Sequence, residues 1–138
     1  MKANLRKTAA SFAAVLFCAC SFGPSAAEKA EAGTLSRAID LLREAPNAQK
    51  RELFTALQKT SCETPDLCEL KKICESGYAK HLSGLEQTAT AKSLLADGGA
   101  DGEVVDVLAA ATASLKEAEP QIARCADAQG AAHRKYKF

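Results

Sequence analysis

Residues 61–74 read Ser61-Cys62-Glu63-Thr64-Pro65-Asp66-Leu67-Cys68-Glu69-Leu70-Lys71-Lys72-Ile73-Cys74, with three cysteines at equal intervals of six. Thr64, Pro65 and Asp66 are typical of the start of a helix. They are, in this order, a capping residue, a proline in the first turn and an acid that the helix dipole favours. We therefore expect a long helix from about Pro65 to Ala96. The glycine-rich residues 97–102 should then form a turn.

Helical spacing of apolar residues continues on both sides of this segment. Thr34 is a candidate cap for a first helix that ends before Pro46, and a second helix should run from Asn47 to about Thr60. A last helix should run from about Glu103 towards Gln129, with Pro120 kinking or splitting it. No segment shows the alternation of a strand. The pattern predicts an all-α fold, a small disulfide-braced bundle of three to four antiparallel helices over residues 34–129.

Four cysteines follow residue 60, and they allow three disulfide pairings. Cys74 shares a helical face with Leu67 and Leu70, and Cys125 continues the apolar face of the last helix. In two antiparallel helices, opposite residues average to the centre of the turn. That average is 99.5 for Cys74 and Cys125, within the glycine-rich turn, and 96.5 for Cys68 and Cys125. We therefore predict the disulfides Cys74–Cys125 and Cys62–Cys68.

A metal-binding role or a redox role fits the spacing of these cysteines less well. Zinc sites favour close pairs such as C-x₂-C, whereas both gaps in residues 62–74 contain five residues. The core also needs a covalent brace, because the chain after residue 27 has no Trp and few aromatic residues. Structural disulfides are therefore the preferred interpretation, and we expect no cofactor and no metal site.

The N-terminal residues have the layout of an export signal. Lys2, Arg6 and Lys7 precede an uncharged segment that runs from Thr8 to Phe22. Cleavage after Ala27 would remove residues 1–27, leave residues 28–33 as a linker and give a periplasmic or secreted protein. The chain would then have 15 basic against 17 acidic residues, which argues against nucleic acid as its partner.

A second processing route ends the signal at residue 19. Residues 16–20, Leu-Phe-Cys-Ala-Cys, resemble a relaxed bacterial lipobox. In that motif the last cysteine is lipidated and becomes the first residue. This resemblance implies that Cys20 anchors the domain to a membrane without spanning it.

Residues 130–138 are the segment with the most functional character. They form a basic and aromatic C-terminal tail, predicted to be exposed and unnecessary for folding, that binds an envelope protein or a membrane surface. The candidate binding residues are His133, Arg134, Lys135, Tyr136, Lys137 and Phe138.

No arrangement of residues indicates an active site, so we expect no enzyme and no catalytic residue. The first hypothesis is an exported binding or accessory protein of the bacterial cell envelope, such as an assembly factor or chaperone. The second is a small-ligand or metal carrier with a site near His81. The third is a secreted enzyme inhibitor that uses residues 62–68 as a rigid loop.

Overall fold

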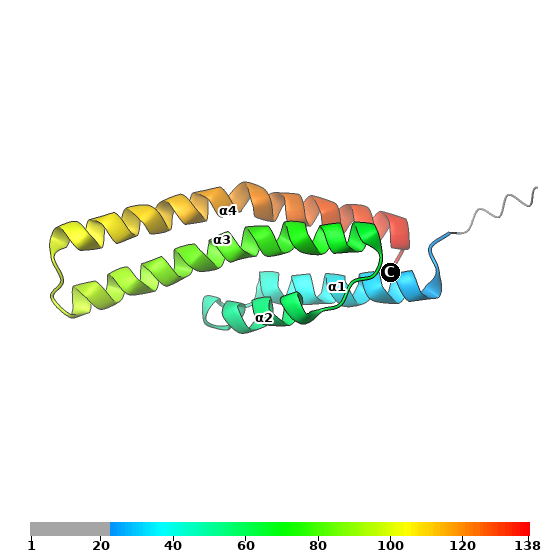
Figure 1. Ribbon diagram of the computed structural model, residues 1–138, viewed down its shortest axis with the longest axis horizontal. Helices are drawn as coiled ribbons and strands as arrows, with labels where there is room; N and C mark the ends of the chain where they lie inside the picture. The colour runs from blue at the N-terminus through cyan, green and yellow to red at the C-terminus, as the bar shows by residue number, and fades with distance from the viewer. Residues whose placement is uncertain (1–22) are drawn as a thin grey trace, which may run out of the picture.

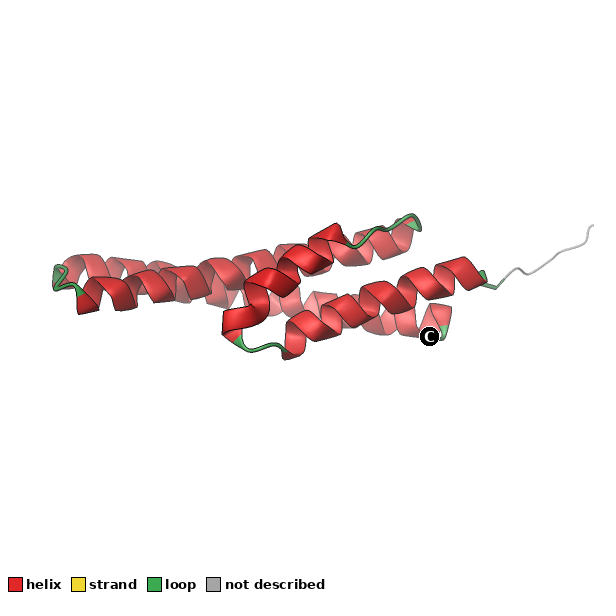
Figure 2. Cartoon of the chain, turned by 90° about the horizontal axis from the view of Figure 1, so that it is seen from below, coloured by secondary structure: helices red, strands yellow, loops and turns green. Residues whose placement is uncertain are grey.

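The computed structural model describes residues 23–138, which form four helices and no strand (Figures 1 and 2). The helices are α1 (Ala26–Glu44), α2 (Asn47–Lys59), α3 (Pro65–Ala96) and α4 (Asp101–Tyr136). Successive helices run antiparallel through short connections (Figure 1). The predicted all-α bundle is confirmed. Of the predicted export signal, only residues 23–27 are among the described residues. Cys20 lies outside them.

All four helices meet only at one end of the molecule, which we call the body. Its core gathers side chains from α1, α2, the first half of α3 and the second half of α4. The largest fully buried residues are Tyr136, Leu35, Ile39, Leu42, Leu57, Leu67, Cys74 and Cys125. The ammonium of Lys50 on α2 donates to the carbonyls of Leu42 (2.9 Å) and Arg43 (3.0 Å). These carbonyls lie in the last turn of α1, where they have no hydrogen-bond donor within the helix.

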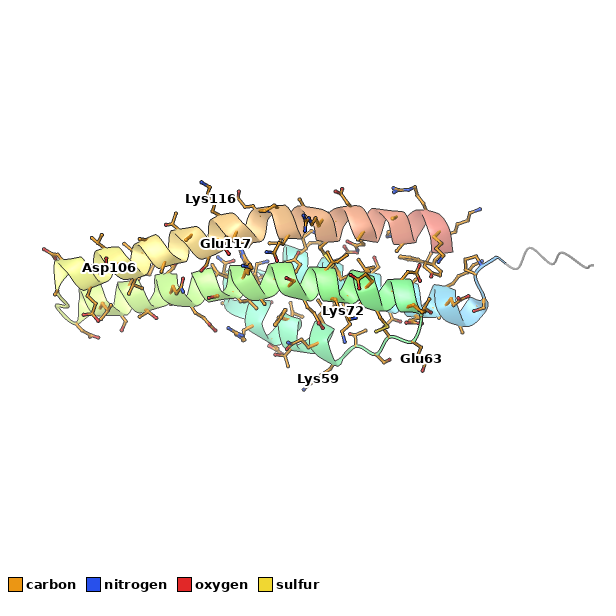
Figure 3. All side chains as sticks on the ribbon, turned by 45° about the horizontal axis from the view of Figure 1, so that its top comes forward. Lys59, Glu63, Lys72, Asp106, Lys116 and Glu117 are labelled. Carbon is orange, nitrogen blue, oxygen red and sulfur yellow. A yellow bond between two sulfur atoms is a disulfide. The ribbon has the colours of Figure 1, made fainter. Side chains whose placement is uncertain are left out.

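The helices α3 and α4 continue beyond the α1–α2 hairpin as a two-helix extension, which we call the arm and define as residues 87–115 (Figures 1 and 2). The arm ends in the turn between Ala96 and Asp101, where Gly98 has a positive φ of 73°. Asp106 lies on the arm, whereas Lys72 and Glu63 lie on the body (Figure 3). A binding partner would therefore meet four helices at the body and only two helices at the arm.

Both predicted disulfides are present. Cys74 and Cys125 join α3 to α4 with their Cα atoms 4.7 Å apart. Cys62 and Cys68 join the α2–α3 connection to α3 with a Cα separation of 5.3 Å. Both sulfurs of the longer bridge are in the core. The predicted pairings Cys74–Cys125 and Cys62–Cys68 are therefore confirmed.

The predicted linker at residues 28–33 is wrong, because these residues lie within the first two turns of α1. The helix begins at Ala26, and Ser25 and Glu28 form a reciprocal capping box: Ser25 Oγ accepts from the Glu28 N–H (3.2 Å) and Glu28 Oε2 accepts from the Ser25 N–H (2.7 Å). Thr34 is not a cap. It lies inside the helix and donates its hydroxyl to the Ala30 carbonyl.

The predicted domain boundary at residue 129 and the separate C-terminal tail are also wrong, because α4 continues without interruption to Tyr136. Pro120 does not split this helix, although α4 bends along its length (Figure 1). Pro120 is exposed, so the Lys116 carbonyl that loses its helical partner lies on the solvent side, where water can satisfy it.

Candidate functional site

The C-terminal residues are docked against the body. Tyr136 is 1% exposed, and its hydroxyl donates to Asp66 Oδ1 at 2.7 Å. The Lys135 ammonium donates to Asp66 Oδ2 at 2.6 Å. These hydrogen bonds, first that from Lys135 and then that from Tyr136, lower the pKa of Asp66. Of the six candidate binding residues, Tyr136 is therefore structural, while Arg134, Lys135 and Lys137 are exposed on the surface around it.

His133 and Phe138 face α1 rather than solvent alone. Their rings stack with centroids 4.1 Å apart, and His133 Nε2 lies 3.5 Å from the buried Ser36 hydroxyl. Both residues line an open depression of about 270 Å³, whose other walls include Arg37 and Asp40. The structure therefore brings part of the predicted binding segment to a mixed polar and apolar hollow.

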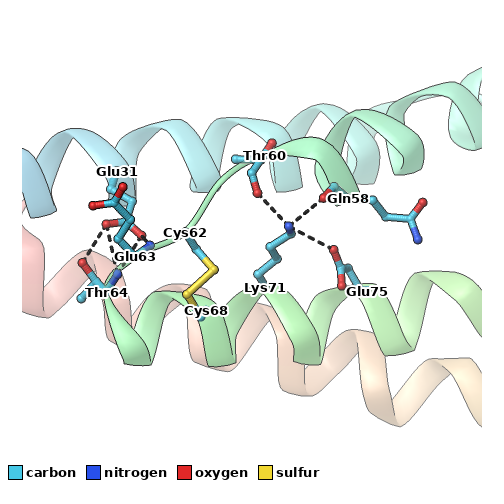
Figure 4. The surroundings of a disulfide bond; sticks show 9 residues. All are labelled: Glu31, Gln58, Thr60, Cys62, Glu63, Thr64, Cys68, Lys71 and Glu75. Atoms are coloured by element: carbon cyan, nitrogen blue, oxygen red, sulfur yellow. Dashed lines mark hydrogen bonds and ion pairs between the residues drawn. A yellow bond between two sulfur atoms is a disulfide. The ribbon is translucent and has the colours of Figure 1, made fainter.

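The 62–68 loop is held on the body (Figure 4). The Glu31 carboxylate on α1 accepts the Glu63 N–H (2.7 Å) and the Thr64 hydroxyl (2.7 Å). Burial raises the pKa of Glu31, but these hydrogen bonds outweigh burial and leave it lowered. Lys71 on α3 donates to the carbonyls of Gln58 and Thr60, both at 2.7 Å. Glu31 therefore fixes the loop at Glu63 and Thr64, and Lys71 fixes the residues that lead into it.

His81 lies on α3 beneath α2. Burial, followed by the charge of Lys50, lowers the pKa of His81, so the ring is neutral near pH 7. Tyr78 is buried one turn earlier, and its hydroxyl has no hydrogen-bond partner within the described part of the chain. Among residues 23–138, no group of three His, Cys, Asp or Glu side chains is placed to hold a metal ion.

One flank of the α3–α4 pair forms a continuous stripe with a spacing of seven residues. The series on α4 is Leu108, Leu115, Ile122, Gln129 and Tyr136, and that on α3 is Cys74, His81, Thr88 and Leu95. In an antiparallel helix pair, such a spacing keeps residues on one side of the pair. Within the body, this flank is covered by α1 and α2.

Hydrogen bonds identify the covering helices. The Gln129 amide donates to Ser36 Oγ (2.6 Å) and Asp40 Oδ1 (2.9 Å) on α1. Farther towards the arm, Arg51 of α2 forms an ion pair with Glu86. The α1–α2 hairpin ends there, so the remaining members of both series have no helix above them (Figure 2).

The uncovered part of this flank exposes three large apolar side chains. Leu95 is 59% exposed and Leu108 is 40% exposed. Val105, one turn before Leu108 on the same side of α4, is 62% exposed. We call the surface made by Thr88, Leu95, Val105 and Leu108 the open flank. Its counterpart in the body contains some of the most deeply buried residues of the molecule, including Tyr136 and Cys74.

The end of the arm is acidic. Residues 92–108 contain the four carboxylates of Asp97, Asp101, Glu103 and Asp106, and one cation, Lys92. All four acidic side chains are exposed, and none of them forms an ion pair with another described residue. The open flank is therefore an apolar strip on a segment with a net charge of −3.

No protein-family model, no curated protein and no solved structure matches this chain. Within residues 23–138, no helix combines the length and the apolar composition required to cross a membrane.

The exposure of Leu95, Val105 and Leu108 was not predicted from the sequence. A signal was available, since an apolar series that continues past the end of the covering helices must become exposed. The lengths of the helices carry this signal: α3 and α4 have 32 and 36 residues, against 19 and 13 for α1 and α2.

Proposed function

We propose that this chain is an exported, non-enzymatic binding or accessory protein of the bacterial cell envelope, such as an assembly factor or chaperone, and that it binds its partner through the open flank. The observation that carries the proposal is the exposure of Leu95, Val105 and Leu108 on a flank that is buried elsewhere in the same helix pair. Contiguous exposed apolar surface in a small protein commonly marks an interaction site.

The two disulfides point to a non-cytoplasmic environment, because such bonds persist in oxidising compartments. The capping box adds support for the lipidated form. Cleavage after Ala27 would remove Ser25 and place a charged amine in the first turn, where it opposes the helix dipole. A mature protein that begins at Cys20 keeps the cap, and residues 21–24 then form its tether.

The proposed anchor also gives the molecule an orientation. Gly23, Pro24, Lys135 and Tyr136 line a common depression, so the start of the described chain and its C-terminus lie at the same end. The exposed cations Arg134 and Lys137 would then face the anionic lipid surface, at about 1 kcal/mol each. The acidic arm projects from the opposite end of the molecule, away from that surface (Figure 1).

The two alternative functions have less support. An inhibitor needs a projecting loop, whereas Glu31 and Lys71 hold residues 58–64 against the body. A carrier needs space beside His81, whereas the neighbouring Tyr78 and Leu82 belong to the packed core.

Site-specific photo-crosslinking in the native host tests the proposed function. A photoreactive residue at Val105 should give a discrete cross-linked partner, whereas the same residue at Glu52, which is exposed on α2, should not. Adding Leu95→Gln and Leu108→Gln should suppress the Val105 product. Equal products from both positions, or no product at Val105, would reject the arm as the binding element.

A further inference from the structure

We infer that Cys62–Cys68 is an exchangeable disulfide, which a dithiol reductant opens while the protein stays folded, and that Cys74–Cys125 stays closed under the same conditions. The inference does not depend on the open flank. Three observations lead to it: the different burial of the two bridges, the hydrogen bonds that hold the α2–α3 connection without sulfur, and the different lengths of chain that the bridges close.

The two bridges differ in access. Cys74 and Cys125 are both 0% exposed, so a thiol can reach their sulfurs only when the body opens. Cys62 and Cys68 are both partly exposed. Cys62 also lines an open depression of about 220 Å³, together with Glu31 of α1. Because thiol–disulfide exchange requires contact between the attacking sulfur and the bridge, the outer bridge is the accessible one.

Hydrogen bonds hold the connection on both sides of the outer bridge (Figure 4). On one side, the Glu31 carboxylate accepts from the Glu63 N–H at 2.7 Å. On the other side, the Lys71 ammonium donates to the Thr60 carbonyl at 2.7 Å. Neither contact involves a sulfur atom, so both persist when the bridge opens. The segment that gains freedom is then limited to the two residues between these contacts.

The bridges also differ in how strongly the fold protects them. The cysteines of Cys74–Cys125 are 51 residues apart, whereas those of Cys62–Cys68 are six residues apart. In the loop-entropy model, the longer loop gives the greater stabilisation of the folded state. This linkage is reciprocal, because a bridge that stabilises the fold more is itself stabilised more by folding. Reduction of the outer bridge is therefore opposed less by the fold.

A dithiol supplies both electrons for the exchange. One of its thiolate sulfurs attacks Cys62 Sγ, the bond between Cys62 Sγ and Cys68 Sγ breaks, and Cys68 leaves as a thiolate that takes a proton from water. The second thiolate of the reductant then attacks the reductant sulfur bound to Cys62. The Cys62 thiolate leaves and is protonated in turn. The reductant becomes a disulfide, and the folded body carries two thiols that an oxidant can join again.

The test exposes the folded, disulfide-bonded protein to dithiothreitol without denaturant. Samples are alkylated with iodoacetamide at intervals, and peptide mass spectrometry follows each cysteine. Cys62 and Cys68 should be alkylated at least about tenfold faster than Cys74 and Cys125. Circular dichroism should show unchanged helicity while only the outer bridge is open. In concentrated urea, which removes the protection by the fold, the two bridges should open at similar rates.

Reduced glutathione identifies the attacked sulfur, because a monothiol leaves an adduct that acid quenching traps. Tandem mass spectrometry should find glutathione on Cys62 and a free thiol on Cys68. An adduct confined to Cys68 would contradict the attack on Cys62.

Limited digestion with trypsin tests the hydrogen bonds that hold the connection. Lys59 is the last residue of α2, so cleavage after it reports release of the connection. With the outer bridge open, Lys71→Met should increase this cleavage at least about threefold, because the Thr60 carbonyl loses its donor. Lys72→Met, at the adjacent exposed position, is the matched control and should leave the rate unchanged.

Three results would overturn the inference. Equal rates of reduction for the two bridges in the folded protein would remove the distinction between them. Loss of helicity as soon as Cys62–Cys68 opens would make that bridge a structural brace. Equal cleavage in the Lys71→Met and Lys72→Met variants would show that the hydrogen bonds do not hold the connection. None of these measurements involves a partner, so the cross-linking test at Val105 judges the proposed function separately.

Discussion

Tyr136 donates a 2.7 Å hydrogen bond to Asp66, and this contact joins the last turn of α4 to the first turn of α3. The Tyr136 ring lies in the core, and Lys135 pairs with the same carboxylate from the surface. The C-terminus therefore closes the body. Its tyrosine and its exposed cations have separate roles, which mutations can distinguish.

Tyr136→Ala should lower the free energy of unfolding by about 3–5 kcal/mol, because it removes a buried aromatic side chain. Tyr136→Phe should cost only about 1 kcal/mol, since it removes one hydrogen bond. Urea unfolding monitored by circular dichroism measures both. Lys137→Gly is the control: Lys137 is exposed with φ at 53°, so glycine should be neutral or slightly stabilising. An unchanged midpoint for Tyr136→Ala would mean that the C-terminus is not docked.

Stability should fall as the pH drops below about 4. The pKa values of Asp66 and Glu31 are lower in the folded protein than their ordinary values of 3.8 and 4.5. Each carboxylate therefore stabilises the fold above its ordinary pKa, and this stabilisation is lost as pH falls through the lowered pKa. Asp66→Asn should flatten this acid limb in thermal unfolding scans, whereas Asp106→Asn on the arm should leave its shape unchanged. An identical acid limb in both variants would contradict the assignment.

The two disulfides should contribute unequally to stability. By loop entropy, Cys74–Cys125 should contribute about 4 kcal/mol and Cys62–Cys68 about 2 kcal/mol. Removing each pair as a double Cys→Ala variant and comparing unfolding in urea tests this order. Peptide mapping without reduction should recover Cys74 linked to Cys125, and a Cys68–Cys125 peptide would refute the pairing.

Gly84→Ala should destabilise the protein by about 1–3 kcal/mol, because α3 and α4 approach closely at this residue. A Cβ atom built on Gly84 would lie 2.6 Å from Leu115 Cγ and 3.2 Å from the Ala111 carbonyl oxygen. This overpacking outweighs the gain of about 1 kcal/mol in helix propensity. Gly102→Ala is the matched control, since no atom lies within 4 Å of its Cβ position, and it should not destabilise. Thermal unfolding in which both variants behave alike would remove the steric argument.

Mass spectrometry of the protein from its native host should find a lipid-modified Cys20 as the first residue. The physical reason is the Ser25–Glu28 capping box, whose loss costs about 1 kcal/mol. Recombinant chains that begin at residue 21 or residue 28 should differ by that amount in unfolding, and Ser25→Ala should abolish the difference. A native protein that begins at Glu28 would show that the cap is dispensable.

Several features could be predicted from the sequence because they depend on local spacing. The start of α3 at Pro65 follows from its proline and acid, and the turn after Ala96 follows from its glycines. The pairing of Cys74 with Cys125 follows from helical geometry and the position of that turn. Each of these inferences uses residues on one helix or on two helices joined by one short turn.

The C-terminal end of the body was decided by contacts between residues far apart in the chain. The C-terminal segment has the composition of a solvated tail, but α4 is long enough to bring Tyr136 to Asp66, 70 residues earlier. In the same way, the periodicity of Leu95 and Leu108 predicts an apolar face, but it does not predict whether another helix covers that face. Only the lengths and packing of α1 and α2 leave that face exposed, because burial depends on which helix reaches it.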